Sequence, residues 1–158
     1  MADEQFNIAK GRIVELYNRV KSNDPAASAL VVVLLKVAEA DATLRDYDTL
    51  GTLLGGSNTE ANFTNYARKV LTDADLASLP APDDTNDRRE VDLPDQTWTA
   101  AGGTLDNTMV KLLICYDADT GAGADTDIIP LCHYDFPRTT NGTDLIAQFH
   151  PNGFFRAT

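Results

Sequence analysis

The sequence predicts an α+β fold, and two features of the chain support this class. Apolar residues recur at helical spacing in the first third, whereas the last third consists of short apolar runs separated by glycine-containing turns. The 158 residues suffice for one hydrophobic core, or for one core with an appended helix. We expect an N-terminal helix that serves as a docking segment over residues 1–25 and a single α+β domain over residues 26–158.

The first expected element is an amphipathic helix over residues 6–21. Its charged residues lie on other faces than its apolar residues, and Pro25 disfavours helical geometry in the residue before it. A helix with such an apolar stripe must bury it, either on its own domain or on a neighbouring subunit. The stripe consists of Phe6, Ala9, Ile13, Leu16, Tyr17 and Val20.

A buried strand and a second, short helix follow. Residues 28–37 form a continuous, β-branched run, which is typical of a strand buried on both faces. Residues 43–56 combine a leucine-rich stripe with polar residues on the outward side, and Asp41 or Thr43 can cap the start. The two glycines at the end lie where a left-handed helix cap is expected. We interpret the charged residues of this segment as a solvated face and not as a catalytic one.

The remaining elements are expected to be mainly strands of an antiparallel sheet or sandwich. Residues 63–68 alternate in polarity like a half-buried strand, and residues 72–79 favour a helical turn. Pro130 cannot donate a ladder hydrogen bond, so its strand should lie at an edge or contain a bulge. Turn signals at residues 141–143 and 151–153 predict a C-terminal β-meander. The other expected strands are residues 89–93, 97–103, 108–117 and 127–136, the last two of them paired as a hairpin.

The strongest candidate for a ligand site is the loop that joins the last two of these strands. Four aspartates flank flexible glycines there, a combination that suits a hard cation. The spacing does not match the calcium helix-loop-helix motif, because Ala122 and Ile128 occupy the positions of its glycine and its closing glutamate. Aspartate and glycine are also the usual residues of a long hairpin loop, so we expect a plain turn, no metal and no cofactor. The weak candidates are Asp117, Asp119, Asp125 and Asp127.

No familiar catalytic arrangement is present in the sequence, and we therefore predict that the protein is not an enzyme. Cys132 and His133 are neighbours on one expected strand, so their side chains should point to opposite faces. An enzyme would require the fold to bring Cys132, His150 and an acidic residue together. Cys115 and Cys132 are expected to be buried thiols; a bridge between neighbouring strands is the alternative, which a reducing cytoplasm disfavours.

The charge of the chain restricts its partners. Thirteen basic and 24 acidic residues give a net charge of −11, which disfavours general binding to nucleic acid. The longest apolar run, residues 29–38, is interrupted by Lys36 and is too short to cross a membrane. The first residues lack the apolar run of a signal peptide. We expect a soluble protein that is made in a cytoplasm and binds neither nucleic acid nor membrane.

Several blocks of the sequence resemble a family of small virion proteins that tailed bacteriophages, notably those of actinobacteria, encode near their head genes. The resemblance covers nearly the whole chain, and no catalytic residues accompany it. The blocks are "AKGRIVELYNRVKSNDPAASALVVVLLK", "EADATLRDYDTLGTLLGG", "NYARKVL", "DDTNDR", "TWTAAGG", "KLLICYDADTGAGADTDIIPL" and "NGFFRA".

This resemblance implies a structural protein of the virion, assembled in the host cytoplasm. The leading interpretation is a decoration (cement) protein on the outer surface of the head, which binds the major capsid protein in many copies as a homo-oligomer. It would do so by burying apolar area against the shell. The candidate contact residues are Phe6, Ile13, Leu16, Tyr17 and Val20.

Two other functions stay open at this point. The first is a head–tail connector, collar or fibre-anchoring protein, which belongs to the same class of virion parts. The second is a binding module for a molecule of the host surface, with the loops of the β-meander as its contact surface.

Overall fold

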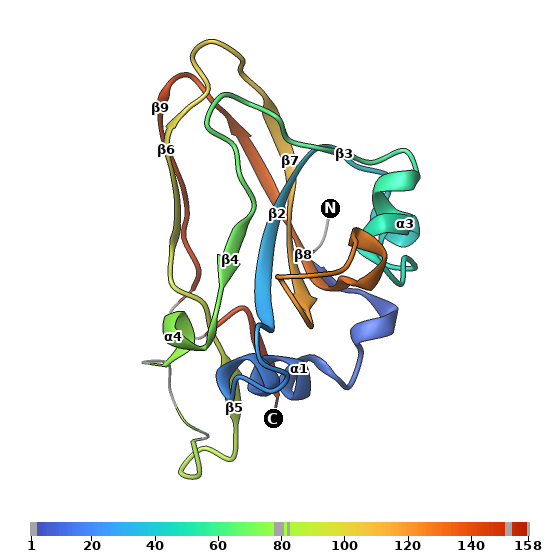
Figure 1. Cartoon of the computed structure of the whole chain (residues 1–158), viewed down its shortest axis with the longest axis vertical. Helices are drawn as coiled ribbons and strands as arrows, with labels where there is room; N and C mark the ends of the chain where they lie inside the picture. The colour runs from blue at the N-terminus through green and yellow to red at the C-terminus, as the bar shows by residue number, and fades with distance from the viewer. Residues whose placement is uncertain (1–2, 78–80, 82, 151–152, 158) are drawn as a thin grey trace.

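The computed structural model describes residues 3–77, 81, 83–150 and 153–157, and antiparallel strands dominate it (Figure 1). The central sheet has six strands in the order β1-β8-β7-β2-β3, with β4 also paired to β2. The expected strands at residues 28–37 and 108–117 and the hairpin with 127–136 are confirmed. The strands are β1 (Glu4–Gln5), β2 (Ala29–Val37), β3 (Thr59–Glu60), β4 (Lys69–Leu71), β7 (Thr108–Asp117) and β8 (Ile129–Thr139).

Pro130 coincides with an irregularity in the pairing of β7 with β8. Ile114 is paired with Cys132, but the next residue, Cys115, is paired with Pro130, so Leu131 has no partner in the register. A bulge at this point is the expected response to a residue without a backbone N–H. The predicted bulge is therefore confirmed.

Two smaller antiparallel pairs complete the strands, and they show that the predicted C-terminal β-meander is wrong. After β8, the chain does not fold back beside it: β9 (Thr143–Ala147) pairs with β6 (Gln96–Ala101). The last strand, β10 (Phe155–Ala157), pairs with β5 (Arg89–Val91). Turn residues predict that the chain reverses, but the strand with which it then pairs depends on distant residues. The second predicted turn, at residues 151–153, lies largely outside the described residues.

The helices are shorter than the sequence predicts. The first helix, α1 (Ile13–Lys21), begins only after a 3-10 turn, η1 (Asn7–Ala9), and after Gly11, whose φ of +79° is incompatible with a continuous helix. The second expected helix is divided into α2 (Asp41–Leu44) and α3 (Leu50–Gly55). The end of α3 is extended and not left-handed, since Gly56 has φ −81° and ψ −152°.

Tertiary hydrogen bonds account for the division of the second helix. The N–H of Leu50 donates to the carbonyl of Ile128 at 2.9 Å, and the Tyr47 hydroxyl donates to Glu39 at 2.7 Å. The helical turn predicted within residues 72–79 is confirmed as α4 (Asp73–Leu76). The strand predicted at residues 63–68 is not: the chain turns there, and Asn65 has a φ of +70°.

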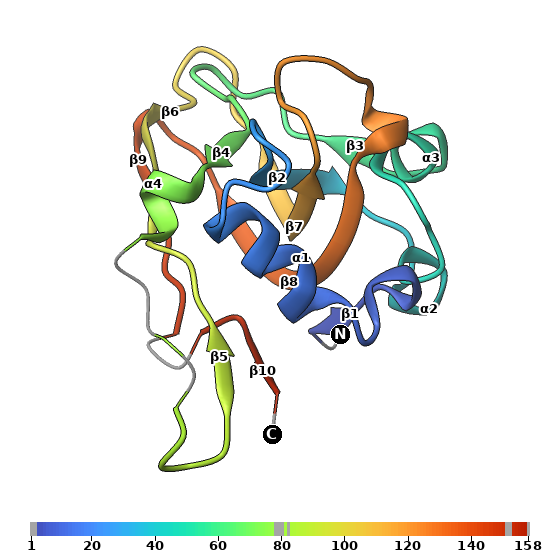
Figure 2. The same ribbon diagram turned by 60° about the horizontal axis from the view of Figure 1, so that its bottom comes forward.

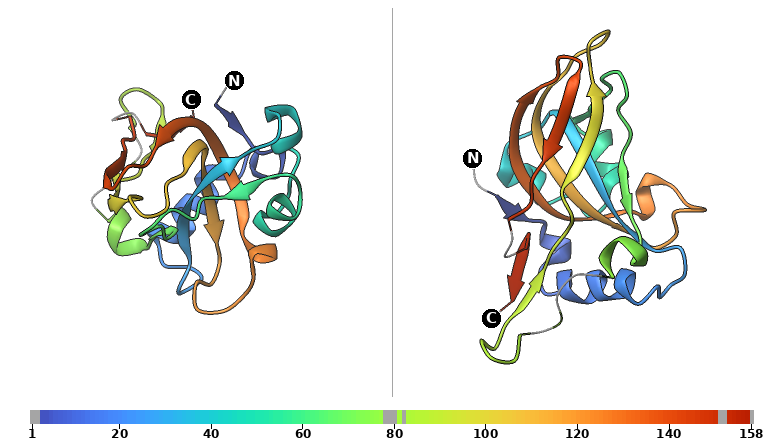
Figure 3. Two further views of the ribbon diagram at one scale, coloured as in Figure 1. Left: turned by 90° about the horizontal axis from the view of Figure 1, so that it is seen from above. Right: turned by 90° about the vertical axis from the view of Figure 1, so that its left-hand side faces the viewer.

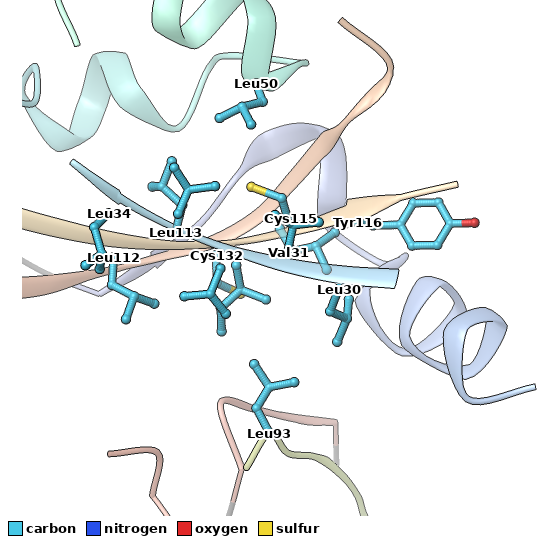
Figure 4. Packing of buried hydrophobic residues seen from close by; sticks show 14 of the residues in the cluster. Leu30, Val31, Leu34, Leu50, Leu93, Leu112, Leu113, Cys115, Tyr116 and Cys132 are labelled. Carbon is cyan, nitrogen blue, oxygen red and sulfur yellow. The ribbon is translucent and has the colours of Figure 1, made fainter. Parts of the chain in front are cut away.

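The strands and helices form layers around one core. Helices α2 and α3 lie on one side of the central sheet, and the pair β6–β9 lies on the other (Figure 2). Leu113 and Cys115 of β7 point toward Leu50 of α3, whereas Leu112 points to the opposite side, where Leu93 lies (Figure 4). Helix α1 covers one end of the layers, as Figure 2 shows. This arrangement gives β7 the two buried faces that its apolar composition predicts.

The N-terminal segment belongs to this core, which corrects the expectation that residues 1–25 dock on a partner. The five candidate contact residues are between 0% and 2% exposed and pack in the same cluster as the central strands. Side chains that are already buried within the subunit are not available for a contact with a capsid. These five residues are Phe6, Ile13, Leu16, Tyr17 and Val20.

Candidate functional site

The aspartate-rich loop is tied to the body of the protein by Arg68. Nη1 and Nη2 of Arg68 donate to the two carboxylate oxygens of Asp125 at 2.5 and 2.9 Å. Nε and Nη2 of the same guanidinium donate to Glu60 on β3 at 2.8 and 2.7 Å. The hydrogen bonds from Arg68 lower the pKa of Asp125. Asp125 is therefore used in a double ion pair that fastens the loop to β3.

The other three aspartates of the loop accept backbone hydrogen bonds from the loop itself. Asp117 accepts from the N–H of Asp119, Asp119 from that of Gly121, and Asp127 from that of Ala124, each at 3.0 Å. These are the short-range contacts of turn residues. In the described parts of the chain, no group of three or more metal-binding side chains comes together.

A buried charge cluster lies at the junction of β7, β8 and α2, and the sequence analysis did not predict it. Lys111 is 0% exposed, although it belongs to the apolar strand β7. Its Nζ lies 2.7 Å from Asp41 at the start of α2 and 2.6 Å from Asp135 on β8. A charged group is stable in such a place only when it is paired. Lys111 thus connects the helical layer to the sheet.

His133 is buried beside this cluster without a hydrogen bond. It is 0% exposed, its ring contacts Phe6 edge to face at 5.4 Å, and neither ring nitrogen has a hydrogen-bond partner among the described residues. Burial lowers the pKa of His133 below its usual value, and the positive charge of Lys111 lowers it further. The carboxylates of Asp41, Glu4 and Asp135 oppose this shift only in part.

We expect His133 to make the protein less stable below about pH 6.5. Its pKa is lowered in the folded state, so the unfolded chain takes up the proton first as the pH falls, and the free energy of unfolding decreases. Urea unfolding of the wild type between about pH 7.5 and about pH 5.5 should show this decrease, and the variant His133→Leu should lose most of it.

His150 supplies the control for this experiment, because it is exposed and is the other of the two histidines. The variant His150→Gln should keep the decrease of the wild type. If lowering the pH decreases the free energy of unfolding of His133→Leu as much as that of the wild type, other groups cause the pH dependence.

The two cysteines are free and buried, as predicted. Cys115 faces α3, and Cys132 lies on the opposite side of the sheet (Figure 4), so the alternative of a bridge between them is wrong. Burial raises the pKa of the Cys132 thiol to about 12. A thiol with such a pKa is a poor nucleophile at neutral pH.

A hollow of about 300 Å³ lies between β8 and the segment that follows β9. Four aromatic side chains line it: Tyr134 and Phe136 come from β8, whereas Phe149 and Phe154 come from the C-terminal segment. The Tyr134 hydroxyl donates to the carbonyl of Phe154 at 2.5 Å, which holds this segment against the sheet. The sequence shows two aromatic residues on the predicted strand, but it does not predict that Phe149 and Phe154 lie opposite them across the hollow.

The outer face of β6 and β9 is a second candidate, here as a contact surface. Its side chains alternate with the buried Trp98, Ala101, Leu145 and Ala147, and no other element lies over it (Figure 3, right). Ile146 is 48% exposed there. The one charged residue on it, Asp144, accepts a hydrogen bond from the N–H of Ala100. We define the β6–β9 face by Thr97, Thr99, Ala100, Asp144 and Ile146.

Among the described residues, no helix has the length and the apolar character needed to cross a membrane. Comparison of the chain with protein-family models, with curated proteins and with solved structures finds no match.

Proposed function

We propose that the protein is a structural component of a bacteriophage virion, and specifically a decoration protein on the outer surface of the head. The observation that carries the proposal is the resemblance of sequence blocks, spread over nearly the whole chain, to small virion proteins encoded near head genes. A net charge of −11 is consistent with a protein that stays soluble at high copy number and does not bind packaged nucleic acid.

The contact surface in this proposal is the β6–β9 face and not the N-terminal helix. The centres of protein interfaces are depleted in charged residues. This face presents threonine, alanine and isoleucine and one charged residue, Asp144, in a chain in which 23% of the residues are charged. It belongs to a strand pair that is packed on the core through Trp98 and Leu145. Such a surface can bind a shell without rearrangement of the subunit.

The proposal is tested by adding purified protein to empty heads and measuring bound copies per head. A decoration protein saturates at hundreds of copies, whereas a dozen or fewer indicate the connector, collar or fibre-anchoring alternative. The variant Ile146→Asp replaces the exposed apolar side chain of the β6–β9 face by a second charge beside Asp144 and should weaken binding at least about tenfold. Val37→Asp is the matched control, because Val37 is 49% exposed on a different strand, β2.

Two outcomes would contradict the proposal. Failure of the folded protein to bind heads at any concentration removes the virion role, and equal loss of binding in both variants removes the β6–β9 face as the contact. Attachment of the isolated protein to host cells without attachment to heads would favour the host-surface binding module instead.

A further inference from the structure

The aromatic hollow has features of a ligand site that a virion-structural role does not explain. Its volume of about 300 Å³ is at the lower end of the range for small-molecule sites. Its aromatic residues are half-buried, and Leu112 and Ala147 complete an apolar lining. Two segments that are distant in the sequence contribute two aromatic residues each. A small apolar ligand, or one side chain of a larger one, fits such a space.

The charges around the hollow determine which ligands it accepts. Its lining residues include Asp3, Asp135 and His150 but neither lysine nor arginine. The nearest buried cation, Lys111, is paired with both Asp41 and Asp135, so the cluster carries a net negative charge. This field repels an anionic ligand and attracts a cationic one.

The aromatic lining restricts the ligand further. The face of an aromatic ring attracts a cation, but a primary ammonium is strongly hydrated and loses its water at a high cost in an apolar site. An alkylated ammonium is more weakly hydrated and has apolar methyl groups that can contact the rings. We propose that the hollow binds an alkylated ammonium group on a short apolar stem.

The test compares choline with its neutral isostere 3,3-dimethyl-1-butanol, which has the same shape and lacks the charge. Each is titrated into the ¹⁵N-labelled full chain, and binding is followed by the backbone amide shifts of residues 134–136, 148–150 and 153–154. We expect choline to bind at least about tenfold more tightly than the isostere. The variant Phe149→Leu keeps an apolar side chain but removes one aromatic ring. It should weaken the binding of choline more than the binding of the isostere.

Two aspartate variants separate the local charge from the overall charge. Asp3→Asn removes a carboxylate from the lining of the hollow and should weaken choline binding severalfold. Asp48→Asn changes the net charge equally, but Asp48 is an exposed residue between α2 and α3, and it should leave binding unchanged.

Equal affinity for choline and the isostere would overturn the proposal, because the hollow would then be merely apolar. Shifts with the isostere but not with choline, or no shifts with either compound, would also overturn it. The spectrum of each variant, recorded before the titration and compared with that of the wild type, shows whether the variant is folded. Because the titration uses the free protein, its outcome does not depend on whether the protein binds phage heads.

Discussion

The variant Lys111→Met should lower the free energy of unfolding by about 3 kcal/mol. Methionine fills a similar volume and keeps the strand apolar, but it leaves Asp41 and Asp135 side by side without the cation that both of them contact. The cost arises from the two unpaired carboxylates and not from the loss of packing. Urea unfolding at about pH 7.5 measures the difference.

The origin of this effect can be separated from a general effect of removing a lysine. Replacing Lys36, which is only half-buried on β2, by methionine should change stability by less than about 0.5 kcal/mol. Combining Lys111→Met with Asp41→Asn and Asp135→Asn removes the repulsion and should recover part of the loss. If the triple variant is as unstable as Lys111→Met or less stable, the charge cluster is not the cause.

The variant Trp98→Ala should destabilise the protein by about 3–5 kcal/mol, because it empties the largest side-chain position in the core. Trp98 is 1% exposed and lies between β4 and β9. Its Nε1 donates to the carbonyl of Ala67 at 2.8 Å, and Nζ of Lys69 lies 5.2 Å from the centre of its ring. One side chain therefore attaches the β6–β9 pair to the rest of the core.

The variant Trp98→Phe separates these contributions. It keeps most of the apolar volume and loses the hydrogen bond to Ala67, so we expect a loss of about 1–2 kcal/mol. Because Trp98 is the only tryptophan in the chain, unfolding must be followed by circular dichroism and not by tryptophan fluorescence. Equal losses in the two variants would show that the hydrogen bond, and not the packing, holds the β6–β9 pair.

Loss of that attachment also bears on the proposed function. The β6–β9 face can act as a preformed contact surface only while Trp98 and Leu145 hold its strands on the core. Trp98→Ala should therefore reduce binding to heads even though Trp98 itself is buried. The variant Trp98→Phe, which stays closer to the wild type in stability, should bind nearly as well.

The candidate contact residues show a limit of predictions that rest on hydrophobic periodicity. The apolar residues from Phe6 to Val20 are buried, as an amphipathic stripe requires, but they are buried in their own subunit. A stripe predicts that one face is covered and does not say by what. The same limit explains the C-terminal strands: a strand was predicted at residues 97–103, where most of β6 lies, but its pairing with β9 was not predicted.

By itself, the sequence determined the positions of the central strands, the bulge at Pro130, the burial of both cysteines and the turn role of Asp117, Asp119 and Asp127. Each of these depends on residues that are close in the chain, such as an unbroken apolar run or a missing N–H. The tertiary structure alone decided which strands pair, which surface stays uncovered, and that Lys111 is buried between Asp41 and Asp135. These features depend on contacts between distant segments, and no local pattern of residue types encodes them.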